Sequence, residues 1–280
     1  MVPSSYQDLI DRALVEDLGS GDITTEATVD PETRARADAV ARTPLVVCGG
    51  QLFCAVFQRV DSSLLCEPLV SDGRKVPADT VLWRVSGSAR SILMGERVAL
   101  NFVQRMSGVA TLTRAFVDEL PPNSSTRVVD TRKTTPGLRA LERYAVRTGG
   151  GHNHRDNLAS AVLIKDNHIV AAGGLENAVR RARQSAPHTS RIEIEVDTLP
   201  QFDLALALGC EIIMLDNFSH EQMIEAVSRG RGKALLEVSG GVKLQRVREL
   251  AAAGVDVISA GALTHSAPSA DIALDLELLG

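Results

Sequence analysis

The chain is poor in aromatic side chains and has no excess of basic ones. Phe, Trp and Tyr make up 3% of its 280 residues, and 30 Lys and Arg stand against 35 Asp and Glu, a formal charge of −5. Binding to a nucleic-acid backbone needs a surplus of Lys and Arg, and base stacking needs aromatic rings. The composition therefore argues against a nucleic-acid-binding protein.

Long apolar runs and closely paired cysteines are also missing. The best apolar run, residues 204–210, ends at Glu211 and is far shorter than the ~18 residues of a membrane span. The N-terminal MVPSSYQDLI has no basic segment followed by an apolar one, so we expect no export signal. We therefore expect a cytoplasmic protein with no membrane partner.

The four cysteines are Cys48, Cys54, Cys66 and Cys210. They are scattered and contain no CxxC pair. We expect reduced, mostly buried thiols rather than a disulfide framework or a zinc site.

What the chain does contain is a repeated strand-and-helix pattern in its C-terminal two thirds. Short β-branched runs end in polar residues at 126–130, 161–166, 192–197, 211–216, 234–239 and 255–260. Such runs are typical of buried parallel strands. Helical patterns closed by glycine lie between the later runs, at 199–209, 220–230 and 244–254. Successive right-handed βα units favour a barrel over an open doubly wound sheet, and six strands make that barrel incomplete.

The first 90 residues have a different pattern. They suggest strands at 34–47, 63–70 and 80–86, separated by turn sequences such as DGRKVP. A nearly continuous helix is expected over 92–120, interrupted around Ser107-Gly108, and the alternating segment 271–279 is expected to be a strand that returns to the first domain. We expect an N-terminal domain of residues 1–108, joined by 267–280, and a barrel domain of residues 109–266.

The carboxyl ends of the six expected strands carry charged and small residues. In a βα barrel these ends face the active site. The residues there are Arg132, Lys133, Lys165, Asp166, Glu195, Asp197, Asp216, Asn217, Ser239 and Gly261. One half of this ring is cationic and the other anionic. Isolated buried charges are expensive, so we favour a functional site over the alternative, a salt-bridge network across the barrel mouth.

The cationic half is concentrated between residues 127 and 155, where seven Lys or Arg accompany two acids. Arg139, Arg143 and Arg147, four residues apart, fit a solvated helix face. Guanidinium groups suit bidentate capture of carboxylates or phosphates. The other residues of this segment, Arg132, Lys133, His154 and Arg155, therefore indicate a polyanionic substrate.

The segment contains two further features, a triple glycine and nearby histidines. Gly149, Gly150 and Gly151 alone fit an ordinary turn. His152, His154 and His168 have no carboxylate or cysteine at ligand spacing, so we expect a hydrogen-bonding role for His154 and a structural one for His152.

Two glycine-containing loops follow the last two strands, SGGV at 239–242 and SAGALTHS at 259–266. Free backbone N–H groups before a helix suit a phosphate monoester; the alternative is a pair of tight turns. Glu195 and Asp216, on neighbouring strands, could hold Mg²⁺ through water or bind sugar hydroxyls. A general acid/base pair, as in glycoside hydrolysis, is the competing role.

These residues resemble a known family. The segments DTRKTTPGLRALERYAVRTGGGHNHR (130–155), LIKDNH (163–168), IEIEVD (192–197), MLDN (214–217), LEVSGGV (236–242) and GALTHS (261–266) are similar to quinolinate phosphoribosyltransferase, also called nicotinate-nucleotide pyrophosphorylase (carboxylating). The similarity extends upstream through EDLGSGDITTEA (16–27) and ERVALNFVQRMSGVATLT (96–113).

The resemblance implies a fold, an assembly and a reaction. It implies an N-terminal α/β sandwich and an incomplete α/β barrel, in a homodimer whose active sites mix residues of two subunits; it leaves a further hexamer open. It also implies transfer of phosphoribose from phosphoribosyl pyrophosphate to quinolinate with decarboxylation, giving nicotinate mononucleotide, pyrophosphate and CO₂ in NAD biosynthesis.

The resemblance also assigns roles to matching residues. Quinolinate would contact Arg132, His154, Arg155 and Lys165, with Lys133 nearby and Arg97 reaching in from the partner subunit. Glu195 and Asp216 would serve the ribose hydroxyls and Mg²⁺, and the 5-phosphate would lie on Ser239, Gly240, Gly261 and His265. The expected catalytic set is Lys133, Lys165, Glu195 and Asp216.

Three rival functions remain to be tested. One is phosphoribosyl transfer to another pyridine or small ring acid. Another is Schiff-base chemistry at Lys165 or Lys133, and the third is a non-catalytic sensor of phosphorylated metabolites.

Overall fold

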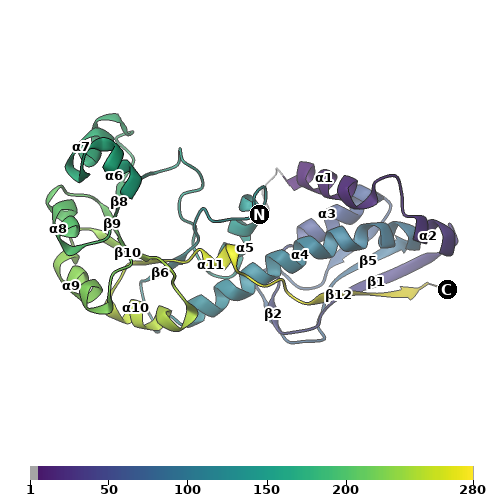
Figure 1. Ribbon diagram of the computed structural model, residues 1–280. Helices are drawn as coiled ribbons and strands as arrows, with labels where there is room; N and C mark the ends of the chain where they lie inside the picture. Colours follow the sequence, from purple (N-terminus) through teal and green to yellow (C-terminus); the bar gives the residue numbers. More distant parts are fainter. Residues whose placement is uncertain (1–5, 280) are drawn as a thin grey trace. The chain divides into compact units, whose positions relative to one another are not determined.

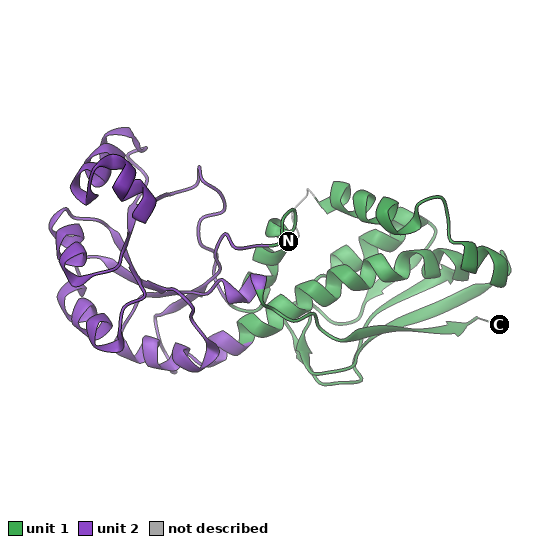
Figure 2. Ribbon diagram, viewed as in Figure 1, with its two compact units in different colours: residues 1–114, 135–150, 266–280 green, residues 115–134, 151–265 purple. Residues whose placement is uncertain are grey.

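The computed structural model describes residues 6–279, so the first half of the segment inspected for an export signal, residues 1–5, lies outside the described part. The chain forms two compact units, each assembled from separate segments (Figure 2). Unit 1 comprises residues 1–114, 135–150 and 266–280, and unit 2 comprises residues 115–134 and 151–265. None of the described helices is long and apolar enough to cross a membrane.

Unit 1 is built on a four-stranded antiparallel sheet of order β12-β1-β5-β3. Its elements are α1 (Tyr6–Leu18), α2 (Ile23–Thr28), β1 (Arg34–Ala41), β2 (Leu45–Val46), α3 (Gly50–Val60), β3 (Leu65–Pro68), β4 (Lys75–Val76), β5 (Val81–Ser88), most of α4 (Ala89–Asp118), α5 (Arg139–Thr148) and β12 (Ile272–Leu278). The expected strand over 271–279 is confirmed, and it pairs with β1.

The two faces of this sheet differ in polarity. Ala35, Ala37 and Ala39 alternate along β1 and are fully buried, and helices cover one face of the sheet (Figure 1). On the other face Arg84 donates to both carboxylate oxygens of Asp38, at 2.7 and 2.8 Å. One covered and one charged face is the usual arrangement for an antiparallel sheet.

The helix α4 runs without a break, so the interruption expected at Ser107-Gly108 is wrong. The Ser107 hydroxyl donates to the carbonyl of Cys48 and accepts its N–H, which satisfies a buried polar group. Gly108 allows close packing, since a Cβ there would lie 2.0 Å from the carbonyl oxygen of Pro268. Both residues serve tertiary packing, which local propensity does not reveal.

The expectation of four reduced cysteines is wrong for two of them. Cys54 on α3 and Cys66 on β3 form a disulfide with a Cα–Cα distance of 5.4 Å. Cys48 and Cys210 are buried free thiols, as expected. Helix α3 lies in a segment to which the sequence assigned no helix, so its packing on β3 and the resulting pair were not foreseen.

Unit 2 contains one parallel six-stranded sheet of order β6-β11-β10-β9-β8-β7, open between its edge strands β6 and β7. Its elements are β6 (Arg127–Val129), β7 (Val162–Ile164), α6 (Asp166–Ala172), α7 (Leu175–Ser185), β8 (Ile192–Val196), α8 (Leu199–Ala207), β9 (Ile212–Asp216), α9 (His220–Gly230), β10 (Leu235–Ser239), the 3₁₀ helix η1 (Leu244–Arg246), α10 (Val247–Ala253), β11 (Val257–Ser259) and α11 (Ala262–His265). All six expected strands are present, and the helices lie outside the curved sheet (Figure 1). The prediction of an incomplete barrel is confirmed.

Local sequence explains how these short βα units begin and end. Ser219 caps α9 in a capping box with Gln222. Gly254 ends α10 in the left-handed conformation, with φ of 93°. Short helices with firm ends return the chain quickly, which keeps all the strands parallel and brings their carboxyl ends to one edge.

Candidate active site

A cavity of ≈ 620 Å³ opens at the carboxyl ends of the unit 2 strands. All its lining residues belong to unit 2. Of the residues singled out from the sequence, it is lined by Arg132, Lys133, His154, Arg155, Lys165, Glu195, Asp216, Ser239, Gly240, Gly261 and His265. Arg97 does not line it; this residue lies on α4 in unit 1, where it is exposed. The fold thus gathers into one cavity side chains that are up to 133 residues apart, from Arg132 to His265.

The cationic wall follows β6 and β7. Burial and the neighbouring charge of Arg132 lower the pKa of Arg155, so the two guanidinium groups are close enough to repel each other. Arg155 also donates to the carbonyl of Ala161 at 3.2 Å. Two partly buried cations held side by side favour an anion between them, and a dianion most of all.

The anionic wall comes from β8 and β9. Glu195 forms an ion pair with Lys165, and Asp216 accepts a hydrogen bond from the side-chain amide of Asn217 at 2.9 Å. Burial raises the pKa of Asp216, and the charges of Glu195 and Asp197 raise it further. This wall therefore carries negative charge that its own lysine does not fully offset.

The glycine loops after β10 and β11 bring backbone close to the cavity. Gly240 has φ of +87°, and a Cβ there would lie 2.8 Å from Oδ1 of Asp216. At Gly261 a Cβ would lie 3.1 Å from both the His265 ring and Cδ of Lys133. Only glycine leaves these amides open at such distances.

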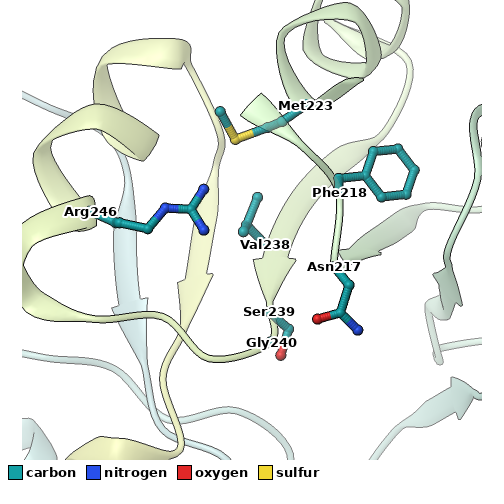
Figure 3. Close-up of a pocket in the computed structure, with 7 residues that line it drawn as sticks. All are labelled: Asn217, Phe218, Met223, Val238, Ser239, Gly240 and Arg246. Carbon is teal, nitrogen blue, oxygen red and sulfur yellow. The ribbon is translucent and has the colours of Figure 1, made fainter. Parts of the chain in front are cut away.

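A smaller cavity of ≈ 210 Å³ adjoins the loop after β10 and shares Ser239 and Gly240 with the larger one. Figure 3 shows the guanidinium of Arg246 pointing into it, toward Val238. The sequence analysis did not single out Arg246, because it lies beyond the strand end in η1.

Hydrogen bonds hold the loop that carries His154 against β6 and the residue that follows it, Asp130. Asp130, fully buried, accepts the backbone N–H of His154 at 2.8 Å and a hydrogen bond from the side-chain amide of Asn153. His152 adds a bridge to Val129 of the strand, donating its N–H to Val128 at 2.8 Å. This backbone role agrees with the structural one expected for His152.

His154 lies against two buried carboxylates, although neither stands at ligand spacing from it in the sequence. Its Nε2 is 3.2 Å from Glu193 on β8 and 3.6 Å from Glu237 on β10. Burial alone would lower the pKa of His154, but the hydrogen bond to Glu193 and the adjacent carboxylate of Glu237 raise it to about 10. Burial also raises the pKa of Glu193. The three groups together therefore hold a proton at neutral pH.

Neither glutamate was singled out from the sequence for this cluster. Glu193 stands inside the IEIEVD strand, where a charge suggests a solvent-facing position. The available signal was its spacing: Glu193 and Glu195 are two residues apart, so both face the inside of the barrel.

Charged walls and open amides at the carboxyl ends of parallel strands define an enzyme site for anionic, phosphorylated substrates. The chain belongs to the quinolinate phosphoribosyl transferase family: that family's N-terminal-domain model matches residues 22–107 and its C-terminal-domain model matches residues 109–275. It is a decarboxylating phosphoribosyltransferase, as the sequence resemblance predicted.

Individual relatives agree over nearly the whole chain. The nicotinate-nucleotide pyrophosphorylase (carboxylating) of Mycobacterium leprae is 45% identical over 276 residues, which cover 96% of each chain. The crystal structure of NadC from Streptococcus pyogenes superposes with a TM-score of 0.95 at 39% identity, covering 100% of this chain and 99% of that one. The nicotinate-nucleotide pyrophosphorylase structure from Ehrlichia chaffeensis gives 0.93 at 41% identity, covering 98% and 99%.

Proposed function

We propose that the unit 2 cavity transfers phosphoribose from phosphoribosyl pyrophosphate to the ring nitrogen of quinolinate, with loss of the 2-carboxylate. Nicotinate mononucleotide, pyrophosphate and CO₂ are the products, a step of NAD biosynthesis. The observation that carries the proposal is that two partly buried, mutually repelling guanidinium groups line the same cavity as the carboxylates of the acidic wall. Quinolinate is a planar dianion, so it fits the first wall.

Each wall has a separate task in this scheme. Arg132 and Arg155 hold the two adjacent carboxylates, with His154 and Lys165 beside them, so that the ring nitrogen faces the anomeric carbon. This is positioning rather than bond-making. As the anomeric bond breaks, positive charge develops on the ribose next to Glu195 and Asp216. Once the nitrogen is quaternised, it stabilises the electron pair that loss of CO₂ leaves on C2, and this carbon then takes up a proton from water to give nicotinate mononucleotide.

The acidic wall fits Mg²⁺. Carboxylate oxygens are the donors this ion prefers. Burial and then the charges of Glu195 and Asp197 raise the pKa of Asp216, and a divalent cation would offset those charges. Glu195 and Asp216 would hold the ion, directly or through water. When bound, it supplies charge neutralisation for the leaving pyrophosphate. Lys133 and Lys165 add positive charge from the protein itself, while Ser239, Gly240, Gly261 and His265 hold the 5-phosphate.

The reaction is tested by mixing the protein with Mg²⁺, phosphoribosyl pyrophosphate and quinolinate. Equimolar release of CO₂ and pyrophosphate is expected, and nicotinate or nicotinamide in place of quinolinate should give little product. Turnover of nicotinate at equal rate would move the function to another pyridine substrate. Borohydride trapping at Lys165 or Lys133 would instead support Schiff-base chemistry, and tight ligand binding without turnover would support a sensor.

The division of the cavity is tested by substitutions on each wall. Arg132→Ala should reduce quinolinate use by at least ~100-fold, because a desolvated charge pair is lost. Glu195→Ala and Asp216→Ala should impair the handling of phosphoribosyl pyrophosphate more than that of quinolinate. The reverse pattern would overturn the assignment of the two walls.

We also propose a cytoplasmic homodimer in which Arg97 enters the partner's cavity. Arg97 is exposed on α4, so its guanidinium group is available to a second copy of the chain. Arg97→Ala and Arg132→Ala should each be inactive, yet a refolded equimolar mixture should recover about a quarter of the parent activity, since one site of each mixed dimer is intact. No recovery in a mixture shown to contain mixed dimers would place Arg97 in cis or outside the site.

A further inference from the structure

Two buried carboxylates at the cavity have no assigned substrate role: Glu237 is among the residues that line it, and Glu193 is not. Glu193 is 4% exposed and Glu237 is 3% exposed, on β8 and β10 of the inner sheet. Carboxylates are seldom buried this deeply unless they are paired. Their common neighbour is the ring of His154, whose Nε2 lies 3.2 Å from both oxygens of Glu193.

The other edge of the same ring faces a donor. Nδ1 of His154 accepts the backbone N–H of Arg155 at 2.7 Å. The carboxylates at Nε2 accept hydrogen bonds, so Nε2 carries a proton directed at them. Glu193 and Glu237 therefore fix the orientation of the ring, and the ring in turn fixes the position of the backbone N–H of Arg155.

A bound metal is the alternative occupant of this cluster, since His154, Glu193 and Glu237 offer three ligand atoms within 4.8 Å of one another. A histidine that binds a metal through Nε2 normally donates its Nδ1–H to an acceptor. Here Nδ1 meets an N–H group, so Nε2 keeps its proton and has no lone pair to give. The arrangement favours a hydrogen-bonded cluster.

We propose that Glu193 and Glu237 are positioning residues for the aromatic dicarboxylate, acting through the ring of His154 and the backbone of Arg155. The proposal rests on the function proposed above and adds to it a buried layer that aims the cationic wall. Without the two glutamates the arginines are still present but poorly oriented. The binding of quinolinate is then weakened, and the binding of phosphoribosyl pyrophosphate is not.

The test compares Glu193→Gln and Glu237→Gln with Glu142→Gln, which replaces a glutamate of unit 1 that is 1% exposed. The isosteric change removes the charge and keeps the volume. We expect each of the first two to raise the KM for quinolinate about tenfold, as for loss of a hydrogen bond to a charged group. The KM for phosphoribosyl pyrophosphate should stay within about twofold. Glu142→Gln should leave both KM values unchanged.

A double-substitution cycle separates an action through His154 from a direct one. In a His154→Ala background, Glu193→Gln should add less than about twofold to the quinolinate KM. Additive effects, or equal changes in both KM values, would overturn the proposal. A stoichiometric metal in the purified parent that is lost in Glu193→Gln would replace it with a metal site.

A spectroscopic measurement distinguishes failure of this proposal from failure of the proposed function. In ¹⁵N-labelled parent protein the His154 ring should show a protonated Nε2, and Glu193→Gln should shift its signal. If quinolinate is not turned over but this signature is present, the function fails and the cluster stands. The opposite tautomer overturns the cluster whatever the substrate.

Discussion

Gly240→Ala tests whether the backbone after β10 must approach Asp216. A Cβ on residue 240 would lie 2.8 Å from Oδ1 of Asp216, shorter than real Cβ contacts, and 3.0 Å from Oδ1 of Asn217, which is tighter than most of them. The φ of +87° also places the new side chain in the left-handed region, at a cost of roughly 1–2 kcal/mol.

Gly241→Ala is the matched control. Its φ is +57°, so it has the same kind of backbone strain, but a Cβ there meets nothing within 4 Å. Both variants should therefore lose roughly 1–2 kcal/mol of stability. Only Gly240→Ala should displace the Asp216 carboxylate, which we expect to raise the KM for phosphoribosyl pyrophosphate about tenfold, or 1.4 kcal/mol.

The assay is initial-rate kinetics with each substrate varied in turn, alongside thermal unfolding of both variants. A quinolinate KM that is unchanged within about twofold is expected for both. Equal effects of the two alanines on the phosphoribosyl pyrophosphate KM would refute the reasoning, because strain alone would then account for the loss. An unchanged KM in Gly240→Ala would show that the close approach has no bearing on binding.

Two further predictions concern unit 1. The hydrogen bond from Arg84 lowers the pKa of Asp38 below its unfolded value, so the pair stabilises the fold above about pH 4 and this contribution fades as pH falls through the folded pKa. The melting temperature of Asp38→Asn should thus lie below that of the parent at pH 7 and meet it at acid pH; a constant gap would contradict this. The Cys54–Cys66 bond closes a short loop and should contribute about 2–4 kcal/mol, so dithiothreitol should lower the parent's melting temperature but not that of Cys54→Ser. Thiol titration of the unfolded, unreduced parent should find the two free cysteines, and a value of four would contradict the disulfide.

The strands of unit 2 could be predicted because burial on both faces leaves an unmistakable apolar run. Examples are the buried strand residues Val128, Ile194 and Ile213. The parallel topology then places every polar strand end at one edge, so the residues that line the cavity followed without coordinates.

What could not be predicted depends on contacts between distant segments. Glu237 became part of the His154 cluster only when β10 and the loop after residue 151 came together. Cys54 and Cys66 met only because an unforeseen helix packed on a short strand. Local sequence patterns carry no information on contacts between distant segments. For the same reason they do not show whether a polar residue of a strand, such as Glu193, faces solvent or the interior.

The pairing of β12 with β1 has a consequence for biosynthesis. Residues 272–278 are translated after the whole of unit 2, yet they hydrogen-bond to residues 35–41. While the ribosome is still extending the chain, β1 exposes a free edge, the kind of surface that recruits chaperones or neighbouring nascent chains. The amino-terminal half of the polypeptide thus cannot mature before the carboxyl-terminal half has been made, and fragments expressed without that late strand should aggregate.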